Sequence, residues 1–392
     1  MAYGFVITTG DADLRLSERL FNLIAEVRVE QDMSKPTKFA VRFEEDICDG
    51  DRQALSATEI EPGTKVAVLV PGSDDSLVCL VQGQVTKFKS SAVTGGPGSW
   101  LEIHGEDLRA ALSRETVTAT WTGTAAGIAE SVFAMHAIES EVKDCETPAF
   151  GTEEGQRTHN QSGPDLQLLE ALARMLGYEF WFSYTATASP TGSFVIEPKA
   201  MFKPSPDYDT AGGGVTFPAP SIDLLGPGEV KTLRLDVAEG CCRTVTSFRI
   251  DVDVEKATMA VVNGHDDLNG EEDSSETADP RTPSDLSATR RPEFFGCQRT
   301  ISDPGAGSAA ERADENRAVI AEEGWFVTAA ASTSAHLMEG VVQAHDIVAV
   351  EGNGFVHSGR YHVSKVVHVV NGWVHLMDLS LRRNALPEAA YA

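Results

Sequence analysis

Short β-strand patterns near the start of the chain constrain its fold more than any other feature. Apolar and polar residues alternate over 23–29 and 38–43, and nearly continuous apolar runs cover 64–70 and 77–85. Gly and Pro residues separate these segments at intervals of roughly 8–20 residues, a spacing typical of antiparallel barrels and sandwiches. The pattern predicts a first barrel-like β domain over residues 1–115.

Strand patterns return in the last part of the chain, at 230–237, 244–254, 347–351, 361–370 and 373–381. Asn371-Gly372 is the strongest hairpin signal, because both residue types accept a positive φ. As a two-residue turn, it would place His368 directly opposite His375. These patterns predict a second barrel-like β domain over 205–392.

Between the two β domains the apolar period changes from two to that of a helix. Apolar residues recur at helical spacing over 125–137, after the N-cap candidate Thr124, and over 166–176, before the C′ candidate Gly177. Two strand patterns follow, at 178–184 and 192–198. We expect a small α/β insertion domain over 116–204, and therefore a mainly β fold with α insertions.

The net charge of the chain limits the kinds of partner that it can bind. The chain has 59 acidic and 32 basic residues and a formal net charge of −27. Such a surface repels phosphate backbones, so we expect no sequence-specific nucleic acid partner. No apolar stretch reaches the roughly 18 residues of a membrane span. Acidic residues and prolines crowd 264–287, which predicts a loop, and Ala and Glu over 309–324 predict a helix.

The search for catalytic, cofactor and metal residues gives weak candidates. Residues 305–310 match G-x-G-x-x-A, but the buried strand that a dinucleotide site needs is missing before them. No nucleophile elbow, P-loop or H-E-x-x-H motif is present. The six cysteines have no zinc-ligand spacing and predict small buried thiols; they lie at 48, 79, 145, 241, 242 and 297. We therefore assign no catalytic, cofactor-binding or metal residue.

Four histidines cluster near the end of the chain: His357, His362, His368 and His375. His362 and His368 have equal parity, which predicts that they face the same side of one strand. They lie roughly 20 Å apart along an extended strand, too far to share a metal ion. His368 and His375, across the hairpin, could touch a metal ion, but no third ligand is suggested, so we expect them to form a cross-strand or interface pair.

Several segments of the chain resemble segments of a known protein family and occur in the same order as in that family. In the first β domain they lie at 24–32, 36–39, 62–66, 81–85 and 101–108. In the insertion they are 120–136, Gln161-Ser162-Gly163-Pro164-Asp165 with the helix after it, and 173–181. Near the end they lie at 345–352, 358–363 and 381–384. The chain resembles the phage late control protein D family, the baseplate hub of contractile tails, whose module also forms the N-terminal part of VgrG spikes.

The resemblance implies a homotrimer in which three chains form a ring of six barrel-like domains with pseudo-sixfold symmetry. Such a ring would adapt the sixfold tail tube to the threefold central spike and line the channel for DNA or effectors. Few residues follow Asn384, so we expect the spike to be a separate protein. A tail tube or tube-initiator protein and baseplate wedge or adaptor proteins are the other expected partners. The expected location is the baseplate of a virion tail or injection particle, assembled in a bacterial or archaeal cytoplasm.

The resemblance gives the negative charge a hypothetical role, because an acidic channel would repel DNA phosphates. The strand at 64–70 and the hairpin of Trp373 are candidate contacts between subunits. A structural, non-enzymatic role is expected. The alternatives are a baseplate-associated cell-wall hydrolase, which needs a carboxylate pair or metal set, and a carbohydrate-binding β-module, which needs a row of surface aromatics.

Overall fold

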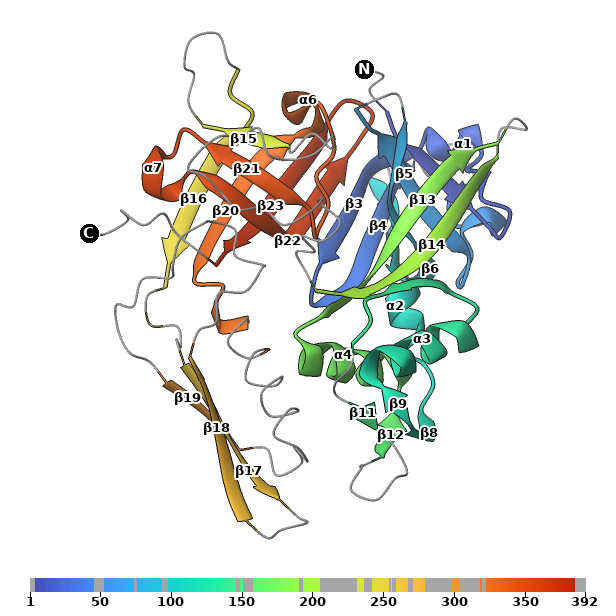
Figure 1. Ribbon diagram of the computed structural model, residues 1–392. Helices are drawn as coiled ribbons and strands as arrows, with labels where there is room; N and C mark the ends of the chain where they lie inside the picture. Colours follow the sequence, from blue (N-terminus) through green and yellow to red (C-terminus); the bar gives the residue numbers. More distant parts are fainter. Residues whose placement is uncertain are drawn as a thin grey trace.

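The computed structural model describes residues 4–45, 53–73, 76–93, 98–145, 149–150, 158–189, 193–204, 231–235, 242–253, 255, 259–266, 271–278, 298–302, 318 and 322–384. These residues form a mainly β fold with helical insertions, as predicted (Figure 1). Within them no helix is long and apolar enough to cross a membrane.

One 13-stranded sheet runs through the molecule in the order β16-β20-β23-β22-β3-β4-β7-β6-β5-β1-β2; off this path, β21 pairs with β22, and β15 pairs with β21. Its first β unit comprises β1 (Val6–Thr9), β2 (Leu14–Arg15), β3 (Ile24–Asp32), β4 (Lys35–Glu45), β5 (Lys65–Pro71), β6 (Leu77–Ser91) and β7 (Ser99–Asp107). Its last β unit comprises β15 (Thr232–Arg234), β16 (Ser247–Val252), β20 (Val327–Ser334), β21 (Ile347–Glu351), β22 (Gly359–Val370) and β23 (His375–Arg383). Short helices border the sheet: α1 (Glu18–Phe21), η2 (Thr58–Ile60), α2 (Leu108–Ala111), α6 (Ala335–Met338) and α7 (Gly354–His357).

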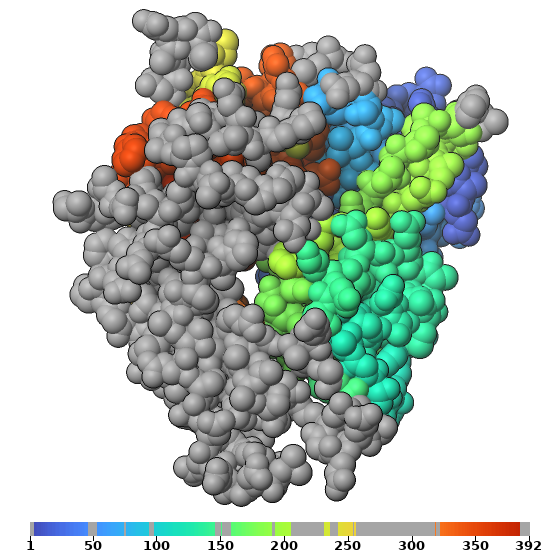
Figure 2. Space-filling view, in the orientation of Figure 1, coloured from blue at the N-terminus to red at the C-terminus, as the bar shows by residue number. Residues whose placement is uncertain are grey.

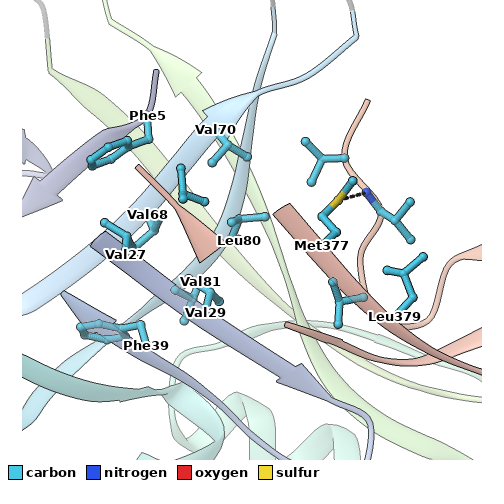
Figure 3. Close-up of a cluster of buried hydrophobic side chains, with 14 of the residues drawn as sticks. Phe5, Val27, Val29, Phe39, Val68, Val70, Leu80, Val81, Met377 and Leu379 are labelled. Carbon is cyan, nitrogen blue, oxygen red and sulfur yellow. Dashed lines mark hydrogen bonds between the residues drawn. The ribbon is translucent and has the colours of Figure 1, made fainter. Parts of the chain in front are cut away.

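The two β units meet where β3 pairs with β22 in antiparallel register, from Lys365 opposite Asp32 to Val370 opposite Val27. The hydrophobic core is also shared across this pairing. Buried side chains from both units, among them Val29, Phe39, Met377 and Leu379, belong to one apolar cluster (Figure 3). On β3, β4 and β7 the alternation of apolar and polar residues thus places one face of the sheet in the core and the polar side chains on the other face.

The insertion lies between the two β units in sequence, and in Figure 1 its two helices lie below the first unit, whereas its last two strands extend over that unit. It contains β8 (Val117–Trp121), β9 (Gly123–Thr124), α3 (Ala125–Met135), β10 (Glu139–Val142), β11 (Ala149–Phe150), β12 (His159–Gly163), α4 (Asp165–Leu176), β13 (Glu179–Ala188) and β14 (Phe194–Lys203). Both predicted caps are confirmed. The Thr124 side chain accepts a hydrogen bond from the Gly127 amide at 3.1 Å, and Gly177 ends α4 with a left-handed φ of +65°.

The apolar run at 64–70 is continuous because both faces of β5 are buried. Val66, Val68 and Val70 enter the shared core, whereas Ala67 and Leu69 contact side chains of β14. The β13–β14 hairpin crosses the surface of the first β unit to reach them (Figure 2). Because β1 and β6 pair with the two edges of β5, this strand is not a free edge, and strand pairing between subunits through 64–70 is not open to it.

The acidic segment 264–287 is not a loop throughout, which corrects the prediction. A three-stranded sheet contains β17 (Met259–Asp266), β18 (Glu271–Ala278) and β19 (Gln298–Ser302), and β18 lies inside the acidic segment. Backbone pairing with β17 over eight residue pairs outweighs the weak strand propensity of its Glu and Asp residues. Residues 305–310 lie outside the described residues, as does most of the helix predicted over 309–324, of which 318, 322 and 323 are helical.

Candidate functional site

A buried glutamine organises the seam, by which we mean the pairing of β3 with β22. Gln31 has the parity of the core residues Val27 and Val29, and its amide nitrogen donates a hydrogen bond to the Leu80 carbonyl at 2.8 Å. Its amide oxygen accepts one from the Ala344 amide at 3.0 Å. Gln31 therefore links the two β units by polar contacts inside the apolar core, and sequence analysis missed it. A single Gln at a core position of an alternating strand was the available signal.

His368 and His375 form a side-chain pair beside Gln31, but not in the predicted register. The His368 Nδ1 and His375 Nε2 atoms are 2.9 Å apart, and His368 Nε2 lies 3.5 Å from the Gln31 amide oxygen. The turn spans 371–374, so His375 pairs with Val370 and is a diagonal neighbour of His368. The Asn371 side chain causes the longer turn, because it accepts hydrogen bonds from the amides of Trp373 and Val374.

His362 and His368 do not share a face of β22, contrary to the prediction from parity. The pairing of β22 with β23 shifts by one residue between Val363 and Lys365. Val363 and Val366 both enter the core, so the shift reverses the parity between them. His368 therefore faces the core, whereas His362 faces the opposite side toward Arg382.

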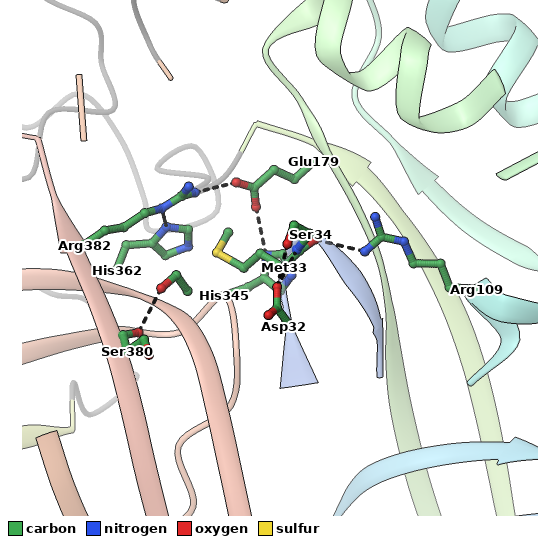
Figure 4. A network of polar contacts seen from close by, with 10 residues as sticks. Asp32, Met33, Ser34, Arg109, Glu179, His345, His362, Ser380 and Arg382 are labelled. Carbon is green, nitrogen blue, oxygen red and sulfur yellow. Dashed lines mark hydrogen bonds and ion pairs between the residues drawn. The ribbon is translucent and has the colours of Figure 1, made fainter. Parts of the chain in front are cut away.

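A second joint, which we call the ionic joint, connects the last β unit to the insertion. The Glu179 carboxylate, at the start of β13, accepts a hydrogen bond from Arg382 Nη2 and forms an ion pair with this guanidinium. The other carboxylate oxygen, Glu179 Oε2, lies 3.1 Å from His345 Nδ1 (Figure 4). Arg382 Nε also donates to His362 Nδ1 at 3.2 Å. Charged hydrogen bonds of this kind are stronger than neutral ones, so Glu179 fixes two segments of the last β unit at once.

Aromatic rings enclose the ionic joint. The Trp325 ring lies 4.1 Å from the Arg382 guanidinium, and the Trp181 ring stacks on His345 at 4.0 Å between centroids. Trp181 thus contributes a stack at the joint, while Phe182 lies in the core of the insertion. Cation–π contact of this kind strengthens as water is excluded from the charge.

The two joints shift the pKa of their groups in different ways. Burial would raise the pKa of Glu179, but the hydrogen bond from His345 and the charges of Arg382 and His345 lower it to about 2. Burial lowers the pKa of His362 and His368 well below the ordinary histidine value. Burial also lowers the pKa of His375 to about 4. The ionic joint is therefore charged at neutral pH and the seam is neutral.

Arg109 ties the insertion to the first β unit. Its Nη1 donates to the carbonyls of Met33 at 2.9 Å and Lys35 at 3.3 Å, at the turn between β3 and β4. Its Nη2 pairs with Glu170 of α4 at 2.9 Å. The guanidinium also lies over the Phe180 ring, so one buried side chain contacts three elements.

The sheet face opposite the shared core carries an array of cross-strand ion pairs. Lys38 of β4 lies 3.6 Å from Glu106 of β7, and Lys365 of β22 contacts both Glu30 and Asp32 of β3. Among the charged residues of this face on β3, β4, β6, β7 and the part of β22 that follows its register shift, the acidic and basic residues are equal in number. The acidic residues are Glu26, Glu30, Asp32, Glu44, Glu102 and Glu106, and the basic residues are Arg28, Lys38, Arg42, Lys87, Lys89 and Lys365. This central face is thus charge-balanced in a chain of net charge −27.

The cysteines and metal ligands can be placed only in part. Cys79 is buried, as predicted, and burial raises its pKa to about 12. Cys145 is half-buried and accepts a hydrogen bond from the Ala126 amide at 3.4 Å, whereas Cys242 is exposed, contrary to the prediction. Cys48, Cys241 and Cys297 lie outside the described residues. Within the part of the chain that the structure describes, no group of three His, Cys, Asp or Glu residues has metal-site geometry.

Comparison with solved structures identifies the fold. The tail protein from Neisseria meningitidis MC58 superposes with a TM-score of 0.63 at 14% identity, covering 97% of each chain. The 43 kDa tail protein of prophage MuSo2 from Shewanella oneidensis gives a TM-score of 0.61 at 12% identity, covering 98% of this chain and 100% of that chain.

A longer structure shares the same fold. A chain of the Francisella PdpA-VgrG complex gives a TM-score of 0.55 at 8% identity, and the match covers 98% of this chain and 53% of that chain. No family model and no curated protein sequence matches this chain. The chain therefore shares its fold with these phage-related tail proteins and with a chain of the PdpA-VgrG complex.

Proposed function

We propose that this protein is a structural baseplate hub of a contractile tail or contractile injection system, and that it assembles as a homotrimer. One observation carries the proposal: a single sheet passes through two β units of the same chain by way of the β3–β22 pairing. Three such chains supply six β units. A ring of that kind has threefold symmetry for a spike and pseudo-sixfold symmetry for a tube.

We assign the charge-balanced face of the sheet to the wall of the channel. It spans β3, β4, β7 and the adjoining part of β22, so it crosses the junction of the two β units and would present its paired charges to a passing polymer. Its ion pairs neutralise one another at short range, so the face neither attracts nor repels a polyanion strongly. This assignment departs from the hypothesis of an acidic channel and places the excess carboxylates on other surfaces.

The proposal includes partners and a location. A separate spike protein, a tail tube or tube-initiator protein and wedge or adaptor proteins of the baseplate would contact the ring. The assembly would sit in the baseplate of a virion tail or injection particle. The structural neighbours are tail proteins, which favours a non-enzymatic role, and no observation among the described residues favours the cell-wall hydrolase.

The test is the mass in solution, measured by light scattering across a concentration series with and without the candidate spike protein. We expect a species of three times the chain mass of 42.0 kDa, and negative-stain images of that species should show a ring with a central hole. A monomer under both conditions, with no ring, would contradict the hub.

A further inference from the structure

The pair of His368 and His375 lies where the two β units are joined. His368 is fully buried, on the core face of β22, and His375 projects from β23 toward it. Gln31 extends from β3 on the other side of His368. The three side chains thus form a chain of polar contacts across the strands that hold the two units together.

The hydrogen-bond pattern fixes which nitrogen atoms carry protons. Ala344 donates to the Gln31 amide oxygen, so that oxygen is an acceptor and the nearby His368 Nε2 carries a hydrogen. His368 Nδ1 is then bare and accepts the hydrogen bond from His375 Nε2. A proton added at His368 Nδ1 would set two donors face to face 2.9 Å apart.

The charged groups around the pair oppose protonation or are already neutralised. Lys231 is close enough to His368 to lower its pKa, and it lies 2.9 Å from Asp346 in an ion pair. The acidic residues of β3 beside the pair, Glu30 and Asp32, lie on the opposite face of the sheet, where Lys365 binds them. Among the described residues, no unpaired carboxylate therefore faces the pair to hold an imidazolium there.

We propose that the histidine pair makes the seam a proton-sensitive joint, which opens in mild acid before either β unit unfolds. Opening separates β22 from β3, exposes both imidazoles to water and lets each take up a proton. Closing requires both rings to be neutral, and the Gln31 contacts then re-form. The role is conformational and holds for a single chain, so it does not depend on the proposed ring.

Hydrogen exchange read by mass spectrometry on the full chain tests the proposal. Amides of 27–31 and 366–370 should lose protection between pH 7.5 and pH 5 after correction for intrinsic exchange, while 179–188 keeps its protection. His375 alone raises the open fraction about 30-fold over this range, because its pKa rises from about 4 to the usual value of about 6.5 on opening. His368 adds a further increase of the same sign.

Variants distinguish the effect of the histidine pair on seam protection from the effect of other histidines. His368→Asn combined with His375→Gln keeps a donor and an acceptor at the contacting positions and removes the titration. This variant should change its seam protection less than about 3-fold over the same pH range, well below the increase expected from even one titrating histidine. His336→Gln, at an exposed histidine of α6, is the matched control and should behave as the wild type.

If the double variant does not fold, the pH dependence of hydrogen exchange in the wild type is sufficient to test the proposal. The logarithm of the open fraction plotted against pH should have a slope between one and two protons from pH 6 to pH 5. A slope near zero would overturn the proposal. Loss of protection at 179–188 in step with the seam would also overturn it, because that result means global unfolding.

Discussion

The seam and the ionic joint both connect the last β unit to an earlier part of the chain, but the seam uses neutral polar groups and the ionic joint uses charged ones. Both are largely shielded from water and rich in histidine. The seam uses a neutral network of Gln31, His368 and His375. The ionic joint uses the charges of Glu179 and Arg382, enclosed by aromatic rings.

The difference shows how burial and charge are matched. Glu179 is kept ionised because a guanidinium and an imidazole face it, which outweighs the cost of burial. His368 has no such partner, and burial keeps it neutral. Acid therefore acts on the two joints over different pH windows.

The largest effect should come from removing the cation of the ionic joint. Arg382→Leu leaves Glu179 buried with only His345 against it, and we expect a loss of about 3–5 kcal/mol in the free energy of unfolding. Urea denaturation at pH 7 measures it. Arg28→Leu on the exposed sheet face is the matched control and should cost less than about 1 kcal/mol. Equal losses would mean that burial of the pair has no energetic consequence.

An intermediate effect should appear in strong acid. Glu179 has its pKa lowered from 4.5 to about 2, so its contribution is present above pH 4.5 and is lost as pH falls toward 2. The wild type should lose about 3 kcal/mol more than Glu179→Gln over that window. Urea denaturation at pH 5, 3 and 2 gives the difference, of which about 2 kcal/mol should appear between pH 5 and pH 3. Parallel curves for the two proteins would show that the ionic joint does not titrate there.

The smallest effect should come from the exposed face. Lys38 and Glu106 have side chains exposed by 55% and 36%, so water and salt screen their ion pair. Lys38→Ala should lower the free energy of unfolding by about 0.2–1 kcal/mol. This loss should become smaller as the salt concentration rises from about 0.05 to about 0.5 M, because salt screens exposed ion pairs strongly above roughly 0.1 M. Thermal unfolding at the two salt concentrations measures this. A cost above that of Arg382→Leu would reverse the order of the two regions.

Local patterns predicted most of the strands and both long helices, because each depends on nearby residues. The cap at Thr124 and the left-handed Gly177 followed from residue type alone. The mainly β fold with a helical insertion is confirmed for the same reason. The pairing of β3 with β22 could not be read in this way, since it joins residues at opposite ends of the chain.

The errors have local causes that a sequence does not display. One residue of register shift near Ser364 reversed the parity of His362 and His368, and nothing in the residue types there marks the shift. The side chain of Asn371 extended the turn and moved His375 by one pairing position. The ionic joint was missed because its three polar residues, Glu179, His345 and Arg382, come from separate segments.

The pairing of β3 with β22 also has a consequence for how the chain is made. His368 is 337 residues beyond Gln31, so β3 leaves the ribosome long before its partner exists. Until then the free edge of β3 exposes unpaired backbone groups, and edges of this kind invite pairing with other chains. Contacts so distant in sequence also slow folding. We expect newly made chains to need dilution or a chaperone until β22 arrives, and truncations that lack it to aggregate.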